Sequence, residues 1–460
     1  MIGLVTLALA GTAPDLVIRN ARIVDVDSGT HVMGHVAIDA GKIVSVGDTA
    51  SDTDGETTIV EAGGRYLIPG LWDTHVHSVT NWSWHAPAFL AYGITSVRNL
   101  HTSEAEGYAL IRDIKAQGER GEAPRIIANG FIVGGEESEW GGMIKVLDAE
   151  DARAAVDAHI ENGMDLIKVY HSMRAEQYRA LIAYADERGL PVDGHLPGDI
   201  KTQEAVKLGQ RTIEHGIEMS HGCSDWDKAD ALVAAAERPE VDGPSGPIEF
   251  AIMSRADNAS RNEERCAAVA ELMAEHGTVS VPTIVNTASR MALTAMATQG
   301  QENSLPRPLY ERWMEMAASP LGRAVSELSA SELQYYGRNI DYFRDAGVTV
   351  LAGTDVGNPF IAPGASLIRE LEYLTEFGMT PREALASATT EPARVFEIEG
   401  LGCIAAGCIA DLVLLDHDPL AEISNVRSIA GVVHSGTYKP KAELDAALAA
   451  ALDKENSKGQ

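Results

Sequence analysis

Residues 70–77 read GLWDTHVH, an apolar run that ends in two histidines separated by one residue. A run of this length, preceded by a Pro69-Gly70 turn, is typical of a β-strand that is buried on both faces of a parallel sheet. Side chains alternate along a strand, so His75 and His77 point to the same side of it. The stretch therefore predicts a buried strand that carries two imidazoles at its end.

Similar runs recur through the middle of the chain, and stretches with helical periodicity lie between them. Strands that alternate with helices are typical of an α/β fold with a parallel sheet. Eight such strands predict a (β/α)8 TIM barrel over residues 69–398. The further runs are TSVRNL (95–100), RIIANGFIV (125–133), LIKVY (166–170), PVDGHLP (191–197), RTIEHG (211–216), VSVPTIV (279–285) and TVLAGTD (349–355).

Two connections in this barrel, residues 221–257 and 287–324, are longer than a barrel needs. Extra length after a strand end falls on the active-site face, so we expect lids or specificity loops there. Near the end of the barrel, Thr380, Pro381 and Glu383 have the spacing of a capping box and predict the start of a helix.

Short β-type runs separated by Gly and Asp turns flank the barrel on both sides. Close turn signals of this kind are typical of a small β-sandwich. We expect the two chain termini to build this sandwich together, from residues 14–68 and 399–442. Residues 443–460 are expected to form a C-terminal helix or tail.

Polar residues lie at or near the ends of several predicted strands. Lys168 lies in the fourth strand, His195 ends the fifth, His215 the sixth and Asp355 the eighth. The carboxyl ends of barrel strands surround one mouth, where these side chains should meet the two histidines of the first strand. Imidazole and carboxylate ligands suit zinc, iron or manganese. The predicted metal ligands are His75, His77, Lys168, His195, His215 and Asp355.

Each of these residues taken alone has a plainer interpretation. A single histidine at a strand end is more often a hydrogen-bonded core residue than a ligand. A lysine inside an apolar strand must be neutralised, paired or modified. For Lys168, a buried ion pair with Asp193 or Glu214 is therefore the alternative to a metal ligand. The metal site is favoured because all six residues occur in order at strand ends.

This set resembles the metal-site series of the amidohydrolase superfamily, and most closely its imidazolonepropionase-like and metal-dependent dipeptidase (prolidase-like) branch. Residues 407–413, GCIADLV, are similar to a family signature in the closing part of the sandwich. The chain departs from many relatives at Arg98-Asn99, where they carry an Arg-Asp pair. The residues that carry the resemblance are His75-x-His77, Lys168, His195, His215 and Gly353-Thr354-Asp355.

The resemblance implies a binuclear site for two divalent ions, zinc in the first place, with manganese or iron as alternatives. One ion would be held by His75, His77 and Asp355, and the other by His195 and His215. Lys168 would bridge both ions as a carbamate formed with carbon dioxide. True imidazolonepropionases use one metal and lack the bridging lysine, so Lys168 argues against that particular activity.

A binuclear site of this kind implies a hydrolase that cleaves an amide-like C–N bond in a dipeptide or an N-acyl amino acid, using a metal-activated hydroxide. Asp355 would accept a proton from the attacking water and pass it to the leaving group. Tyr170 and His171 either donate hydrogen bonds to a developing oxyanion or serve only in packing and loop capping. The alternatives are a cyclic amide or imine hydrolase or deaminase, then a lactonase or phosphoesterase, and last a non-catalytic binding protein.

The composition excludes several classes of protein. Hydrophobic residues make up 45% and charged residues 23% of the 460 residues, as in ordinary globular proteins. The 67 acidic and 37 basic residues give a net charge of −30, which would repel a phosphate backbone or an anionic membrane. We therefore expect no nucleic acid and no membrane as partners. Two further expectations, which do not follow from the charge, are a small-molecule substrate and a homo-oligomer. No nucleotide-binding glycine pattern follows a strand, so no nucleotide cofactor is implied.

The cysteines and the amino terminus bear on localisation. Cys223, Cys266, Cys403 and Cys408 are sparse, and buried free thiols are expected, although Cys403 and Cys408 could pair in an exported protein. Residues 1–13 contain a short apolar stretch without a positive start. The localisation is thus open between the cytoplasm and, if these residues are a truncated signal, the periplasm or the exterior.

Overall fold

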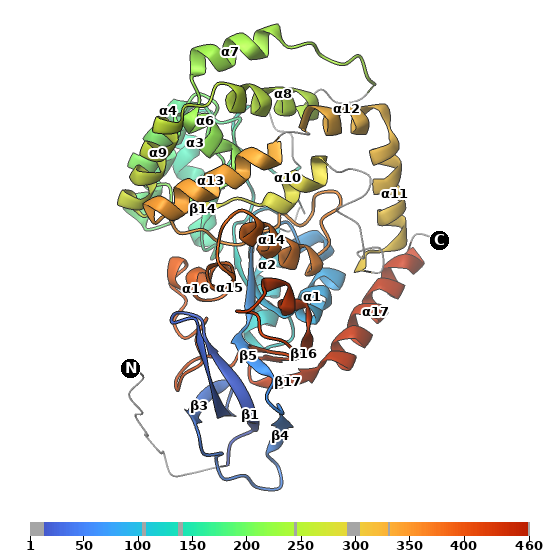
Figure 1. Cartoon of the computed structure of the whole chain (residues 1–460). Coiled ribbons are helices and arrows are strands. Elements are labelled where there is room, and N and C mark those ends of the chain that lie inside the picture. Colours follow the sequence, from blue (N-terminus) through green and yellow to red (C-terminus); the bar gives the residue numbers. More distant parts are fainter. Residues whose placement is uncertain are drawn as a thin grey trace.

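A computed structural model describes residues 13–103, 107–136, 141–242, 246–291, 304–329 and 332–458. The protein has the mixed α/β fold that the sequence predicted. Figure 1 shows strands from both ends of the chain at one end of the molecule and the helices α7 and α8 at the opposite end. The amino-terminal residues 1–12, on which the signal-peptide question depends, lie outside the described residues.

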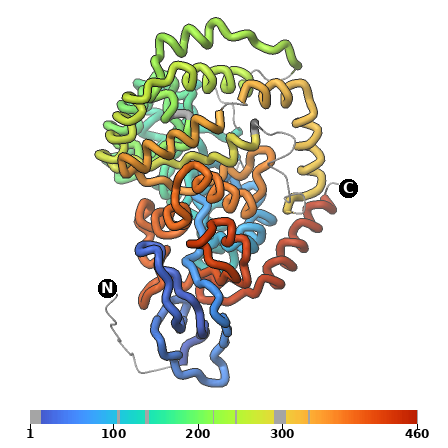
Figure 2. The backbone as a smooth tube through the Cα atoms, in the orientation of Figure 1, coloured from blue at the N-terminus to red at the C-terminus, as the bar shows by residue number. Residues whose placement is uncertain are grey.

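Strands from both termini form one eight-stranded sheet, in the order β17-β16-β15-β5-β1-β2-β3, with β4 paired to β1. The two ends of the chain meet where β5 pairs with β15 in antiparallel fashion, with Leu67 opposite Leu414. Figure 2 shows these blue and red segments coming together. The strands are β1 (Leu16–Asp25), β2 (Thr30–Asp39), β3 (Lys42–Gly47), β4 (Thr58–Glu61), β5 (Tyr66–Pro69), β15 (Leu412–Leu415), β16 (Ile429–His434) and β17 (Thr437–Pro440).

The middle of the chain forms two parallel sheets. One has the order β6-β7-β8 and the other the order β10-β9-β11-β12-β13-β14. All of these strands except β10 overlap with seven of the eight runs that the sequence predicted, and most are buried throughout. The strands are β6 (Leu71–Val76), β7 (Ile94–Asn99), β8 (Arg125–Ala128), β9 (Val133–Gly134), β10 (Ile144–Lys145), β11 (Ile167–Val169), β12 (Val192–Gly194), β13 (Thr212–Glu214) and β14 (Val279–Val281).

The eighth predicted strand, residues 349–355, is irregular in the structure. It still runs between the two sheets, because the Leu351 N–H donates to β14 at 2.9 Å and the Asp355 N–H donates to the carbonyl of His75 at 2.8 Å. Asp355 has a φ of 66°, outside the range of extended backbone. Only isolated bridges, at Val350 and Val356, pair the segment with β14 and β6.

Helices follow the strands along the chain, and α15 begins with the predicted capping box of Thr380 and Glu383. No helix in the described ranges has the length and apolar character needed to cross a membrane. The helices between the strands and at the C-terminus are α1 (Trp82–Ala91), α2 (Gly107–Glu119), α3 (Ala149–Glu161), α4 (Ala175–Arg188), α5 (Thr202–Lys207), α9 (Glu263–His276), α13 (Glu332–Ala346), α14 (Ala365–Glu376), α15 (Pro381–Ser387), α16 (Thr390–Val395) and α17 (Lys441–Lys458).

The two long connections fold into helices that pack on each other. Ile248 and Ile252 of the first connection lie in one apolar cluster with Ala324 and Val325 of the second. Residues 292–303 of the second connection lie outside the described residues. The helices are α6 (Ile217–Cys223), α7 (Trp226–Ala235) and α8 (Gly246–Ala259) in the first, and α10 (Ile284–Met291), α11 (Arg307–Ala318) and α12 (Pro320–Ser329) in the second.

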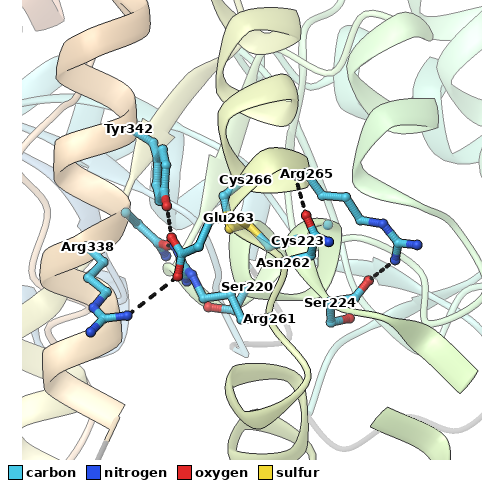
Figure 3. Close-up of a disulfide and its surroundings, with 12 residues drawn as sticks. Ser220, Cys223, Ser224, Arg261, Asn262, Glu263, Arg265, Cys266, Arg338 and Tyr342 are labelled. Carbon is cyan, nitrogen blue, oxygen red and sulfur yellow. Dashed lines mark hydrogen bonds and ion pairs between the residues drawn. A yellow bond between two sulfur atoms is a disulfide. The ribbon is translucent and has the colours of Figure 1, made fainter. Parts of the chain in front are cut away.

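The expectation of free thiols is wrong, because all four cysteines form disulfides. Cys403 pairs with Cys408, and Cys223 pairs with Cys266 across 43 residues. Figure 3 shows the Cys223–Cys266 disulfide, which joins the end of α6 to α9. Packing of these two helices brings the Cα atoms of Cys223 and Cys266 to 4.5 Å, a proximity that spacing in the sequence does not reveal.

Candidate metal centre

Strand β6 brings two imidazoles to one carboxylate. The strand is buried along its whole length. Nε2 of His75 lies 3.3 Å from Oδ1 of Asp355, and Nε2 of His77 lies 2.9 Å from the same oxygen. His75 lies in β6 and His77 directly follows it, and the alternation of side chains continues to His77, so both histidines face Asp355.

His215 and Asp355 lie just beyond regular structure, with φ values of 56° and 66°. Residues with side chains seldom adopt positive φ, and such strained positions cluster at functional sites. One donor atom from each of His75, His215 and Asp355 lies within 4.8 Å of the others, and all three residues are buried. These residues form a group of donors with the dimensions of a metal site.

Lys168 and His195 complete the predicted set. Nζ of Lys168 lies 3.5 Å from Nε2 of His75, and the ring centroids of His195 and His215 are 4.8 Å apart. The backbone N–H of Lys168 donates to Asn129 at 3.0 Å, which holds β11 in place. The structure thus brings all six predicted ligands into one cluster.

A buried ion-pair network lies behind this cluster. The fully buried guanidinium of Arg98 donates to Asp193 at 2.8 Å and to Glu214 at 2.7 Å. The sequence offered these two carboxylates as partners for Lys168, but here both bind Arg98. Residue 99 is asparagine and cannot form an ion pair with Arg98, but carboxylates from β12 and β13 do so.

Glu214 also orients the first imidazole of the cluster. Its Oε2 lies 2.7 Å from Nδ1 of His75, which is the geometry of an N–H donating to a carboxylate. A histidine that donates through Nδ1 keeps Nε2 available as a metal ligand. Arg98 therefore acts through Glu214 to fix the tautomer and the direction of His75.

Burial sets the protonation of the cluster. It lowers the pKa of His75 and of His195 well below the ordinary value and brings the pKa of His215 to about 3. Burial raises the pKa of Asp355, but the attraction of His75 and His215 and the hydrogen bond from His77 together bring it well below its usual range. Neutral imidazoles and an ionised carboxylate are the forms that bind metal ions. The donor set therefore fits a divalent metal.

Tyr170 and His171 lie beside the cluster. The ring of Tyr170 is 5.0 Å from the ring of His195, and the ring of His171 is 6.1 Å from it, between centroids. Both residues follow β11, which also carries Lys168. Their position is compatible with the role predicted for them as hydrogen-bond donors to substrate.

Several residues of the centre were missed from the sequence. Thr283 Oγ1 lies 2.7 Å from Nδ1 of His215, and the side-chain amide of Asn286 donates to Oδ2 of Asp355 at 2.6 Å. His101, two residues after β7, has its ring centroid 6.1 Å from that of His77. Asp73 accepts from the hydroxyl of Thr354 at 2.6 Å. Only His101 had a visible signal, because it too follows a predicted strand.

The sequence pattern of the Amidohydrolase family matches residues 66–438, and the chain belongs to this family. The adenine deaminase of Nitratidesulfovibrio vulgaris (strain DP4) is 33% identical over 218 residues, 43% of this chain and 36% of that protein. The adenine deaminase of Mesorhizobium japonicum is 47% identical over 76 residues, 16% of this chain and 13% of that protein. The chain thus matches less than half of the length of these curated relatives.

Solved structures resemble the whole chain. A putative prolidase from Bifidobacterium longum has a TM-score of 0.69 and 22% identity, covering 95% of this chain and 99% of its own. A Xaa-Pro dipeptidase with bound methionine in its active site has a TM-score of 0.66 and 20% identity, covering 92% and 99%. At these identities the likeness shows a shared fold.

Proposed function

We propose that this protein is a metal-dependent hydrolase that cleaves an amide-like C–N bond in a dipeptide or an N-acyl amino acid. The observation that carries the proposal is the cluster of four histidines, Lys168 and Asp355, in which His75, His215, Lys168 and Asp355 are buried. Membership of the Amidohydrolase family supports hydrolysis of C–N bonds. We further propose that the two parallel sheets and the segment 349–356 together make a (β/α)8 barrel with this cluster at its mouth.

The proposed centre takes two divalent ions, zinc or else manganese or iron. His75, His77 and Asp355 would hold one ion, His195 and His215 the other, and Lys168 would lie between them as a carbamate. The ions would supply Lewis acidity to the scissile carbonyl and to a water molecule. As a carbamate, Lys168 would be an anionic ligand instead of a buried ammonium.

The protein's own residues would then handle protons and charge. Asp355 is ionised, so it can take a proton from the attacking water and hand it to the leaving nitrogen. Tyr170 and His171, beside His195, would donate hydrogen bonds to the oxygen that becomes negative. Arg98 and Glu214 keep His75 oriented while these transfers occur.

A second candidate is hydrolysis of a cyclic amide or imine, or deamination of a heterocycle. The adenine deaminases among the curated relatives favour it, at 33% identity over 218 residues in one case. Attack on a ring carbon uses the same water and the same carboxylate. Lactone or phosphoester cleavage ranks third, and a non-catalytic binding protein last.

Metal content and substrate use test the proposal together. The protein is expressed with zinc or manganese and bicarbonate, and its metal content is measured by plasma mass spectrometry for wild type and Lys168→Ala. About two ions per chain in wild type, and fewer in the variant, are expected for the bridged centre. About one ion, unchanged in the variant, would favour the second candidate. No bound metal would overturn the hydrolase.

A substrate panel separates the candidates further. Dipeptides and N-acyl amino acids are assayed beside cyclic amides, adenine and lactones. Turnover of the first group is expected, and turnover of lactones alone would overturn the amidase.

A further inference from the structure

The start of helix α10 is held by a distant carboxyl group. Glu370 lies in α14, is fully buried, and accepts hydrogen bonds from the backbone N–H groups of Ile284 at 3.0 Å and Val285 at 2.7 Å. These are the first two residues of α10. The first N–H groups of a helix have no partner within the helix, so a side chain or water must satisfy them.

The residues on either side of this contact touch the candidate metal centre. Thr283 directly precedes α10, and its hydroxyl lies 2.7 Å from Nδ1 of His215. Asn286 lies in the first turn, and its amide donates to Oδ2 of Asp355 at 2.6 Å. A segment of four residues therefore reaches two of the proposed ligands, and Glu370 binds its middle.

Other helices of the protein satisfy their first N–H groups locally. Asp148 caps α3, Asn262 caps α9 and Thr380 caps α15, each from the residue just before the helix. Thr283 has the right residue type and the right position to cap α10 in the same way. It has a φ of 45°, and its hydroxyl is directed to His215. The two N–H groups bind Glu370, which is 86 and 85 residues away.

We propose that Glu370 is a positioning residue for the metal centre: it fixes the start of α10, so that Thr283 orients His215 and Asn286 orients Asp355. The inference rests on the proposed function and adds three residues to its machinery. By accepting the two N–H groups, Glu370 leaves the hydroxyl of Thr283 for the imidazole. Asn286 occupies Oδ2 of Asp355, which leaves Oδ1 facing His75 and His77.

The geometry of Glu370 predicts a graded response to substitution. The carboxyl group of Glu370 can accept at both oxygens even when it is protonated. Gln keeps one acceptor oxygen and presents an amide N–H to the other backbone donor. Leu keeps the approximate volume and removes both acceptors. We expect kcat to fall about tenfold in Glu370→Gln and about a hundredfold in Glu370→Leu. KM should stay within a factor of about three of the wild-type value, because a misplaced group slows the chemical step more than it weakens substrate binding. Glu376→Gln, at an exposed site of the same helix, is the control and should behave as wild type.

Two further readouts separate positioning from a structural role. The visible absorption of the cobalt-loaded protein reports the ligand geometry and needs no substrate, and it should change in Glu370→Leu. The variants Thr283→Val and Asn286→Ala should each lower kcat. In the combined Thr283→Val/Asn286→Ala background, Glu370→Leu should cost less than about threefold, because its effect passes through those two residues.

The outcomes are distinguishable. Wild type that binds no cobalt would overturn the proposed function and the positioning role together. The positioning role alone would be overturned if wild type binds cobalt and hydrolyses substrate and Glu370→Leu has the same kcat and the same cobalt spectrum. If Glu370→Leu lowers kcat about a hundredfold in the combined Thr283→Val/Asn286→Ala background as well, the positioning role is also overturned. Glu370 would then act by a route that does not pass through Thr283 and Asn286. If the Glu370 variants do not fold, unchanged kcat and spectra in Thr283→Val and Asn286→Ala overturn it.

Discussion

His75 and His215 lie in the same cluster but are held in different ways. His75 belongs to the regular strand β6, and its Nδ1 is bound by Glu214, which in turn is bound by Arg98. His215 has a positive φ and contacts the neutral hydroxyl of Thr283. We call His75, Glu214 and Arg98 the β6 side, and it depends on buried charges. We call His215, Asp355 and the start of α10 the α10 side, and it depends on hydrogen bonds and backbone geometry. Changes on the β6 side should damage the fold first, and changes on the α10 side should damage the chemistry first.

The largest expected effect is on the β6 side. Arg98→Met removes the charge that two buried carboxylates share. Asp193 keeps its ion pair with Arg211, but Glu214 loses its guanidinium partner in the interior. The free energy of unfolding should fall by about 3–5 kcal/mol. Urea unfolding of wild type and variant measures it. Arg120→Met, which breaks only the exposed pair with Glu122, is the control and should leave the unfolding midpoint unchanged. If Arg98→Met is as stable as Arg120→Met, the β6 side does not depend on its buried charges, and the contrast with the α10 side is lost.

On the α10 side, Asp355→Asn should lower kcat and leave the stability of the fold nearly unchanged. The amide has the shape of the carboxylate and can still accept the hydrogen bond from Asn286, but it cannot take a proton from water. We expect kcat to fall about a thousandfold, while circular dichroism and the unfolding midpoint stay near those of wild type. An active Asp355→Asn enzyme would refute the role of Asp355 as the base.

The disulfides give a smaller effect on stability. Cys223 ends α6, which begins two residues after His215, and its bond to Cys266 closes a loop across 43 residues (Figure 3). Cys223→Ser should lower the free energy of unfolding by about 3 kcal/mol, because the unfolded chain gains freedom. Cys403→Ser opens a loop of only 5 residues and should cost less. Equal losses in the two variants would show that loop length does not set the effect.

The sequence predicted those parts of the site that follow from short-range patterns. Strand alternation and position at strand ends identified all six proposed ligands, and spacing within three residues identified the Thr380 capping box. The sequence could not predict contacts that depend on how elements distant in the chain pack against each other. Glu370 looks like one acidic residue among many, Thr283 has the pattern of an ordinary helix cap, and the Cys223–Cys266 bond requires α6 to lie against α9. The same limit applied to Arg98, whose carboxylate partners come from β12 and β13.

The last expected effect concerns the pH dependence of stability on the α10 side. Burial, with a lesser contribution from Asp73, raises the pKa of Glu370 from 4.5 to about 8, although the two backbone N–H groups and Arg369 act in the opposite direction. The folded protein therefore keeps a proton that the unfolded chain releases between these two values. This contribution to stability is complete below about pH 4.5, declines as the pH rises, and is lost above about pH 8.

Glu370→Gln has no such titration, so comparison with wild type isolates it. The stability of wild type relative to Glu370→Gln should fall by at most about 1.4 kcal/mol per pH unit between pH 5 and pH 8. Urea unfolding of both proteins at pH 5, 6, 7 and 8 measures this, and the difference removes the contribution of the acidic surface that both share. Parallel curves would mean that the backbone N–H groups keep Glu370 ionised in the folded state. The α10 side would then depend on a buried charge as the β6 side does, and the two sides would differ only in backbone geometry.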